Sequence, residues 1–122
     1  AVVALESDAG MCETAQQILI DSEIDNVAVL NGNPDQGFPS QAPFDVIFIE
    51  GVISQIPETL LAQMAENGRL VCVIAKNAET TGKATKVIKN NGSLSYITAF
   101  DLDLSGFARF PFYKNFVFES VS

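Results

Sequence analysis

Acidic side chains next to predicted strand ends are the groups in this sequence best suited to chemistry. Glu6 closes an apolar run over residues 1–5, and Ser7 and Asp8 directly after it are residue types that cap a helix. A carboxylate in that position accepts hydrogen bonds from both hydroxyls of a ribose, because it has two acceptor oxygens. Acids at strand ends are more often simply solvated, so Glu6 alone is only a weak indication of nucleotide binding.

Composition narrows the classes of function further. The 122 residues include no histidine, which excludes a histidine-based triad and histidine metal ligands, and we expect no metal site. The two cysteines, Cys12 and Cys72, lie far apart inside predicted elements, so two reduced core thiols are favoured over a disulfide. No apolar run approaches the roughly 20 residues of a membrane span. We therefore expect no membrane partner and a cytoplasmic location.

Charge is distributed unevenly along the chain. The net charge is −8, with eleven acids and no base through Gly68, and seven bases and four acids from Arg69 onward. Nucleic-acid binding is not expected, because phosphates require a basic surface. Either the acidic part is a solvated surface or a basic partner segment covers it.

Residues 42–75 predict the unit around which the chain is organised: strand, helix, strand. Residues 44–49 and 70–75 are short apolar runs, and helical spacing between them predicts one buried helix face made of Ile56, Leu60, Leu61 and Met64. Pro57 suits the first helical position, and Asn67-Gly68 supplies a left-handed stop. The pattern predicts parallel strands in a sheet covered on both faces.

The flanking segments predict further elements. Residues 25–30 predict a strand, 83–90 fit a strand loosely, and Asn91-Gly92 indicates a hairpin turn into a strand over residues 93–102. The apolar stripe of the first helix is predicted to be Met11, Ala15, Ile18 and Leu19. One face of the 93–102 strand is predicted to carry Leu94, Tyr96, Thr98 and Phe100. In the aromatic tail, Phe116-Val117-Phe118 predicts a short edge strand.

Several segments resemble one family. Residues 42–45 (APFD), 56–57 (IP), 60–61 (LL), 63–64 (QM) and 67–71 (NGRLV) have the order and spacing of the later half of the protein-L-isoaspartate O-methyltransferases. Residues 3–7 (VALES) resemble the family's V-x-x-E-R segment, except at Ser7. Residues 32–39 (GNPDQGFP) resemble its G-D-G-x-x-G-x-P loop, with Asn33 in place of aspartate and Pro34 in place of glycine.

The resemblance implies a fold and a cofactor. The fold is an α/β Rossmann-like methyltransferase three-layer sandwich, in which residues 1–122 form part of the domain. Its sheet is mostly parallel with a C-terminal antiparallel hairpin, and the family's N-terminal strand and glycine-rich loop are missing. The resemblance also implies that five residues contact S-adenosylmethionine in the intact protein: Glu6, Ser7, Asn33, Pro34 and Glu50. Binding by this chain alone is expected to be weak or absent, because Asn33 lacks the charge and Pro34 lacks a backbone donor.

The implied activity is methyl transfer from S-adenosylmethionine to the carboxylate of L-isoaspartyl residues in damaged proteins or peptides. No catalytic residue is carried over, so this chain by itself is expected to be inactive. Two alternatives stay open. One is a receiver-type signalling module, with Glu6 and Asp8 as its acidic pair, Glu50 at the phosphoacceptor position and Lys76 as its lysine. The other is a degenerate fold that serves as an interaction module.

The strand missing from the family pattern would lie between the strand ending at Glu6 and the strand over residues 44–49. Those two strands would then face each other across about 10 Å, two strand spacings, with unpaired backbone on both sides. We expect one of three outcomes: the strands pair directly, a second copy supplies the pairing, or the missing strand is a separate piece. The charge distribution favours the second outcome, a homodimer.

Overall fold

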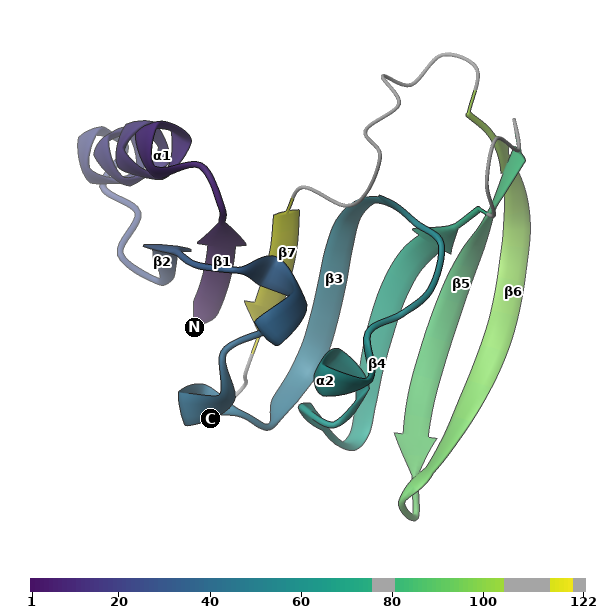
Figure 1. Ribbon diagram of the computed structural model, residues 1–122. Coiled ribbons are helices and arrows are strands. Elements are labelled where there is room, and N and C mark those ends of the chain that lie inside the picture. Colours follow the sequence, from purple (N-terminus) through teal and green to yellow (C-terminus); the bar gives the residue numbers. More distant parts are fainter. Residues whose placement is uncertain (76–80, 105–114, 120–122) are drawn as a thin grey trace.

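The computed structural model describes residues 1–75, 81–104 and, for the backbone, 115–119, and it has α/β architecture around one seven-stranded sheet (Figure 1). The strand order is β2-β1-β7-β3-β4-β5-β6. The strands are β1 (Val2–Glu6), β2 (Val27–Asn31), β3 (Phe44–Ile53), β4 (Met64–Ile74), β5 (Thr81–Asn90), β6 (Ser93–Asp103) and β7 (Asn115–Glu119). Five strands share one direction and β5 and β7 oppose it, so the sheet is mixed.

The first unit consists of β1, the helix α1 (Ala9–Asp21) and the parallel strand β2. Asp8 caps α1 as predicted, because its side chain accepts a hydrogen bond from the Met11 backbone N–H at 3.0 Å. The predicted apolar stripe is wrong: Met11 and Ile18 are more than half exposed, whereas Cys12 is the buried residue of the helix. The helix faces β2 through Cys12 and Gln16, whose side chains both contact the Val29 carbonyl.

The second unit confirms the predicted parallel pair, β3 and β4, but its helix is much shorter than predicted. The helix α2 is Glu58–Leu61, with Pro57 at its N-cap rather than at the first helical position. Met64 already begins β4, so it does not belong to a helical face. Asn67 does adopt the left-handed conformation, with φ 65°, but inside an irregular part of β4.

The backbone is closely packed around Gly68, where β4 passes β3. A Cβ added at Gly68 would lie 3.1 Å from the carbonyl oxygens of Phe44 and Asp45, so glycine lets β4 approach β3 closely there. β4 pairs with β3 at Met64 and again from Arg69, and the left-handed Asn67 lies in the irregular part between these two positions.

The C-terminal hairpin of β5 and β6 forms at the predicted turn. Asn91 and Gly92 have φ values of 53° and 77°, as a tight two-residue hairpin turn requires. The predicted face of β6 is wrong at one position. Thr98 pairs with Thr85 but Phe100 pairs with Ala84, so a β-bulge places Phe100 on the opposite face from Tyr96.

β7 departs most from the sequence prediction. It was expected at an edge, yet its backbone runs antiparallel between β1 and β3 in the middle of the sheet (Figure 1). The gap expected between these strands is therefore filled by a C-terminal segment of the chain itself, an outcome not among the three predicted. Unpaired backbone between two apolar strands is costly, which accounts for the insertion. The aromatic residues of the tail at positions 107, 110, 112 and 113 lie outside the described residues.

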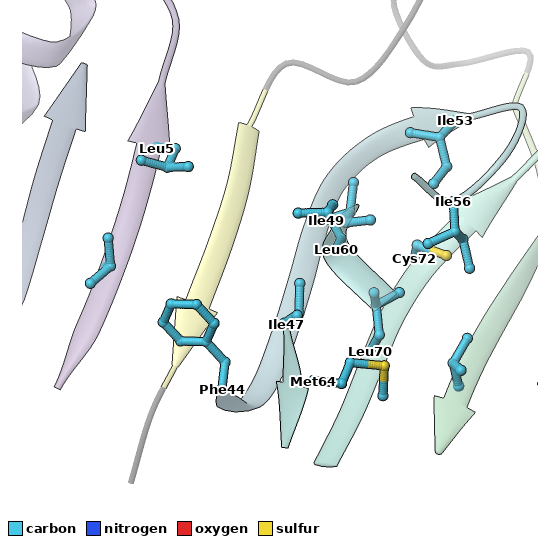
Figure 2. Close-up of a cluster of buried hydrophobic side chains, with 12 residues drawn as sticks. Leu5, Phe44, Ile47, Ile49, Ile53, Ile56, Leu60, Met64, Leu70 and Cys72 are labelled. Carbon is cyan, nitrogen blue, oxygen red and sulfur yellow. The ribbon is translucent and has the colours of Figure 1, made fainter. Parts of the chain in front are cut away.

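A single hydrophobic cluster lies on one face of the sheet, and Figure 2 shows its side chains coming from β1, β3, α2 and β4. On the other face, Phe48 and Val71 are 43% and 37% exposed. The prediction that both faces are covered is therefore wrong for β3 and β4, as far as the described residues reach.

Both cysteines are free and buried, which confirms the prediction of reduced thiols. Burial raises the pKa of the Cys72 thiol to about 12, so this group stays neutral in the core. Within the parts of the chain that the structure describes, neither helix is long and apolar enough to cross a membrane.

Candidate cofactor site

Three of the predicted site residues, Glu6, Ser7 and Asn33, lie near the edge of the sheet where the parallel strands β1 and β2 end. Glu6 pairs in register with Asn31 of β2 on one side and with Asn115 of β7 on the other. Asn115 also pairs with Glu50 of β3. One strand therefore separates the two acids that the sequence singles out. In open α/β sheets, ligands bind at this carboxyl edge, where neighbouring connections leave in opposite directions.

Glu6 is held by contacts from both neighbouring segments. Its side-chain Oε1 accepts a hydrogen bond from the Asp8 backbone N–H at 3.1 Å, which ties the carboxylate to the start of α1. Its carbonyl oxygen accepts from the Gly32 N–H at 3.2 Å, just beyond the end of β2. Glu6 is half-buried and Ser7 is exposed beside it. The carboxylate of Glu6 is thus tied to the start of α1, and its backbone to the segment after β2.

The segment after β2 forms two short 3-10 helices, η1 (Pro34–Gln36) and η2 (Pro39–Gln41). Thr59 of α2 donates its hydroxyl to the Asp35 carbonyl at 2.5 Å. Gln63 spans the loop, since its Nε2 donates to the Gln36 carbonyl at 3.0 Å and its Oε1 accepts from the Phe38 N–H at 2.9 Å. α2 and the residues after it therefore fix the loop relative to β3 and β4.

Glycine is required where this loop turns. Gly37 has φ 64°, and a Cβ added there would lie 2.4 Å from Gln63 Oε1. At Gly32 an added Cβ would meet only a Leu5 methyl group at 3.6 Å. The loop is therefore tightly packed against Gln63 and less crowded near Glu6.

Asp35 is a polar residue of this loop that the sequence prediction did not single out. Its Oδ1 is buried and has no hydrogen-bond partner among the described residues. A buried carboxylate oxygen without a donor is unfavourable. The atom is closed to solvent, so it does not itself offer a contact to a ligand.

The structure brings Glu6, Ser7 and Asn33 to one end of β1 and β2, whereas Pro34 is buried and Glu50 lies two strand positions from Glu6. A cavity lined by Val3, Asn26, Val27 and Gln41, among others, lies at the amino ends of β1 and β2. That is the opposite edge of the sheet, so this cavity does not belong to the candidate site.

The receiver alternative finds little geometric support. Glu6 contacts the backbone of Asp8, and no group of three or more potential metal ligands occurs among the described residues. Lys76, the lysine that this alternative requires, lies outside them.

Comparison with known proteins separates the methyltransferase resemblance from the receiver alternative. The family model of protein-L-isoaspartate(D-aspartate) O-methyltransferase (PCMT) matches residues 1–101 of the sequence. The chain belongs to this family. The family match confirms the resemblance predicted from residues 3–7, 32–39 and 42–71, and the receiver alternative is not favoured.

Relatives in bacteria are longer than this chain. The protein-L-isoaspartate O-methyltransferase of Shewanella pealeana is 37% identical over 73 residues, which cover 60% of this chain and 35% of that protein. That of Pseudoalteromonas translucida is 37% identical over 79 residues, 65% of this chain and 36% of the relative. The matched part thus corresponds to about a third of the length of these PCMT relatives.

Solved structures show the same fold. A protein-L-isoaspartate O-methyltransferase superimposes with a TM-score of 0.75 over 98% of this chain and 33% of its own, at 23% identity. The second is a Plasmodium falciparum protein assigned to the beta-aspartate methyltransferases (PCMT), in complex with S-adenosyl-L-homocysteine. It superimposes with a TM-score of 0.68 over 82% of this chain and 49% of its own, at 24% identity. The predicted Rossmann-like methyltransferase α/β class is confirmed.

Proposed function

We propose that this chain is the part of a PCMT methyltransferase domain that binds the nucleoside end of S-adenosylmethionine. The complete protein then transfers the methyl group to the carboxylate of L-isoaspartyl residues in damaged proteins or peptides, in the cytoplasm. Family membership supports the reaction class. The observation that carries the assignment to this chain is the position of Glu6, which ends β1 and joins the β2 loop through the Gly32 N–H.

The residues at this edge fit a nucleoside. The Glu6 carboxylate offers two acceptor oxygens for the two ribose hydroxyls, and Ser7 and Asn33 add short polar groups nearby. Glu50 borders the site from β3.

When bound, the cofactor supplies the methyl group from its sulfonium centre. The residues of this chain bind and orient the nucleoside, and orientation is the main contribution that a methyl-transfer site of this kind makes to rate. Two features limit binding by this chain alone. Pro34 provides no backbone donor, and β7 lies between the strands that carry Glu6 and Glu50. We therefore expect the isolated chain to be inactive and to bind the cofactor weakly or not at all.

Calorimetric titration of S-adenosylhomocysteine into the complete protein tests the assignment. The Glu6→Gln variant keeps one acceptor for the Asp8 N–H but loses the charge, and it should bind about 10-fold or more weakly, as loss of a charged hydrogen bond costs roughly 1.5–3 kcal/mol. Glu13→Gln, at an exposed position of α1, is the matched control and should bind like the wild type. Equal affinities for the Glu6→Gln variant and the control would remove Glu6 from the site.

A degenerate methyltransferase fold that serves as an interaction module is the second candidate. The observation in its favour is the pair of departures at Asn33 and Pro34, in the loop that the family uses for the cofactor. The same titration separates the two candidates. Saturable binding by the complete wild-type protein supports the enzyme, whereas no heat of binding at any concentration supports the interaction module.

A further inference from the structure

The side chain of Gln63 connects the loop after β2 with the unit formed by β3, α2 and β4. We propose that Gln63 is a positioning residue for the cofactor: its carboxamide holds residues 33–38 in the conformation that presents Asn33 to the nucleoside, without contacting the ligand itself. The inference rests on the proposed function and deepens it, because it names a group outside the site on which the affinity for the nucleoside depends.

The carboxamide of Gln63 is buried, and both of its polar groups bond to the loop. Gln63 is 7% exposed. Its Nε2 donates to the Gln36 carbonyl at 3.0 Å, and its Oε1 accepts from the Phe38 N–H at 2.9 Å. The loop thus presents one acceptor and one donor at the same place, and a neutral carboxamide satisfies both.

The backbone of Gln63 is fixed on the side of the sheet. Its N–H donates to the Leu60 carbonyl of α2 at 3.0 Å, and its carbonyl accepts from the Phe44 N–H at the start of β3 at 2.8 Å. Leu60 and Phe44 are both 0% exposed. Gln63 therefore ties the loop to the buried core of the molecule.

Gln36 transmits this contact to Asn33. The Gln36 carbonyl accepts from Gln63, and the Gln36 N–H donates to the Asn33 carbonyl at 3.1 Å. Gly37 closes the same turn, because its N–H donates to the Pro34 carbonyl at 3.1 Å. One hydrogen-bonded residue thus links the Gln63 carboxamide to the backbone of Asn33, which lies in the candidate site.

The other contacts of the loop make Gln63 its principal attachment. A Cβ added at Gly37 would lie 2.4 Å from Gln63 Oε1, so the loop backbone lies directly against the carboxamide. Thr59 also bonds to the loop, through the Asp35 carbonyl, but at an exposed position. Water replaces an exposed hydrogen bond at little cost, whereas the loss of a buried one leaves its partners unsatisfied. The position of the loop therefore depends mainly on Gln63.

Calorimetric titration of S-adenosylhomocysteine into the complete protein tests the proposal with the Gln63→Met variant. Methionine is of similar size and makes neither hydrogen bond, so this variant should bind about 5-fold or more weakly than the wild type, because a loop that must be ordered on binding lowers affinity. The KM for S-adenosylmethionine should rise by a similar factor, whereas the KM for an isoaspartyl peptide should stay within about 2-fold of the wild-type value.

Val87→Ala is the matched control for loss of stability. Val87 is 0% exposed, like the core residues around Gln63, but it lies on β5, beyond β4 from the loop. Urea unfolding ranks the stability of both variants, and the control should bind S-adenosylhomocysteine like the wild type. A control that loses as much affinity as Gln63→Met would show that general destabilisation is the cause and would overturn the proposal.

Gln63→Glu provides a rescue that a purely structural role would not predict. A neutral carboxyl group restores one donor and one acceptor, whereas a carboxylate only accepts. Burial raises the pKa of a carboxyl group, so its protonation can be followed between about pH 5.5 and 8.5. The affinity of this variant, relative to the wild type at the same pH, should rise as pH falls. Asp35, Asp45, Glu58 and Glu66 are ionisable groups of adjoining elements, and the ratio removes their titration because they are the same in both proteins.

The outcomes separate this inference from the proposed function. Wild-type affinity in both Gln63 variants would overturn the inference and leave the proposed function in place, whereas a wild-type protein that does not bind the cofactor would overturn both. A relative affinity of Gln63→Glu that does not change with pH would show that the two hydrogen bonds are not the cause, and would also overturn the inference. The Gln63→Glu measurement decides the matter if Gln63→Met does not fold.

Discussion

Two antiparallel pairings in this protein differ in how far apart their strands lie in the sequence. β5 and β6 are joined by the turn at Asn91 and Gly92, and much of β6 remains exposed. β7 instead pairs with β1 and β3, which precede it by more than 60 residues, and it lies between buried strands. The first pairing is encoded by local turn chemistry, whereas the second depends on what the rest of the sheet leaves unpaired. The turn residues thus determine that β5 and β6 are neighbours, whereas the backbone groups of β1 and β3 that no other strand pairs determine where β7 lies.

The largest expected effect concerns the buried strands around β7. Ile47→Ala should lower the free energy of unfolding by about 2–5 kcal/mol, because Ile47 is 0% exposed and truncation leaves a cavity. Ile97→Ala in the hairpin is the matched change, and at 43% exposure it should cost less than about 1 kcal/mol. Urea unfolding monitored by circular dichroism measures both. Equal costs would contradict the contrast between the buried inner sheet and the exposed hairpin.

A smaller difference in stability is expected between alanine variants of two glycines that both have positive φ. Gly37→Ala should cost about 2–3 kcal/mol, because alanine is strained at φ 64° and its Cβ would also collide with Gln63 at 2.4 Å. Gly92→Ala in the hairpin turn has φ 77° but open space around it, so only the backbone strain of about 1 kcal/mol applies. The difference between the urea unfolding midpoints of the two variants measures the cost of the contact between the added Cβ at position 37 and Gln63. A Gly92→Ala variant that is the less stable of the two would reverse this interpretation.

Alkaline pH should weaken the core next to the hairpin through Cys72. Its folded-state pKa is raised to about 12 from 9.0, so the unfolded chain loses the thiol proton first as pH rises. The contribution is fully present below pH 9 and is lost between pH 9 and 12, by up to about 1.4 kcal/mol per pH unit. Urea titrations at pH 8 and 10 on wild type and Cys72→Ala measure it. The variant should show the shallower pH dependence, and identical slopes would exclude the thiol as the cause.

The smallest expected loss of stability tests whether the contact of Asp8 with the first turn stabilises α1. Asp8→Ala should cost about 1 kcal/mol, because the side chain of Asp8 accepts the Met11 N–H at the start of α1. Asp101→Ala, at an exposed position of β6, is the control and should change stability by less than about 0.5 kcal/mol. Thermal unfolding followed by calorimetry resolves this difference. A control that destabilises as much as the cap variant would show that the effect is one of charge rather than of capping.

Several sequence patterns with a local physical cause were confirmed, although Pro57 and Asn67-Gly68 did not act as predicted. Glu6 ends its strand and Asp8 caps the helix after it, because both depend on residues within one turn of the chain. The hairpin turn at Asn91-Gly92 is equally local, since both residues tolerate positive φ. The placement of Glu6 at the carboxyl edge of a parallel sheet followed from the same local order of strand, acid and helix.

Tertiary structure decided the features that depend on distant partners. Contact with Val29 of β2 turned α1 so that Cys12, rather than Met11, is buried. Close approach to the carbonyl groups of β3 made the segment around Gly68 part of a strand, and Gln63 fixed the loop that carries Asp35. β7 took the central position because two apolar strands lacked backbone partners there. Residue spacing along the chain reports local preference, whereas these outcomes depend on which groups the folded sheet leaves unsatisfied.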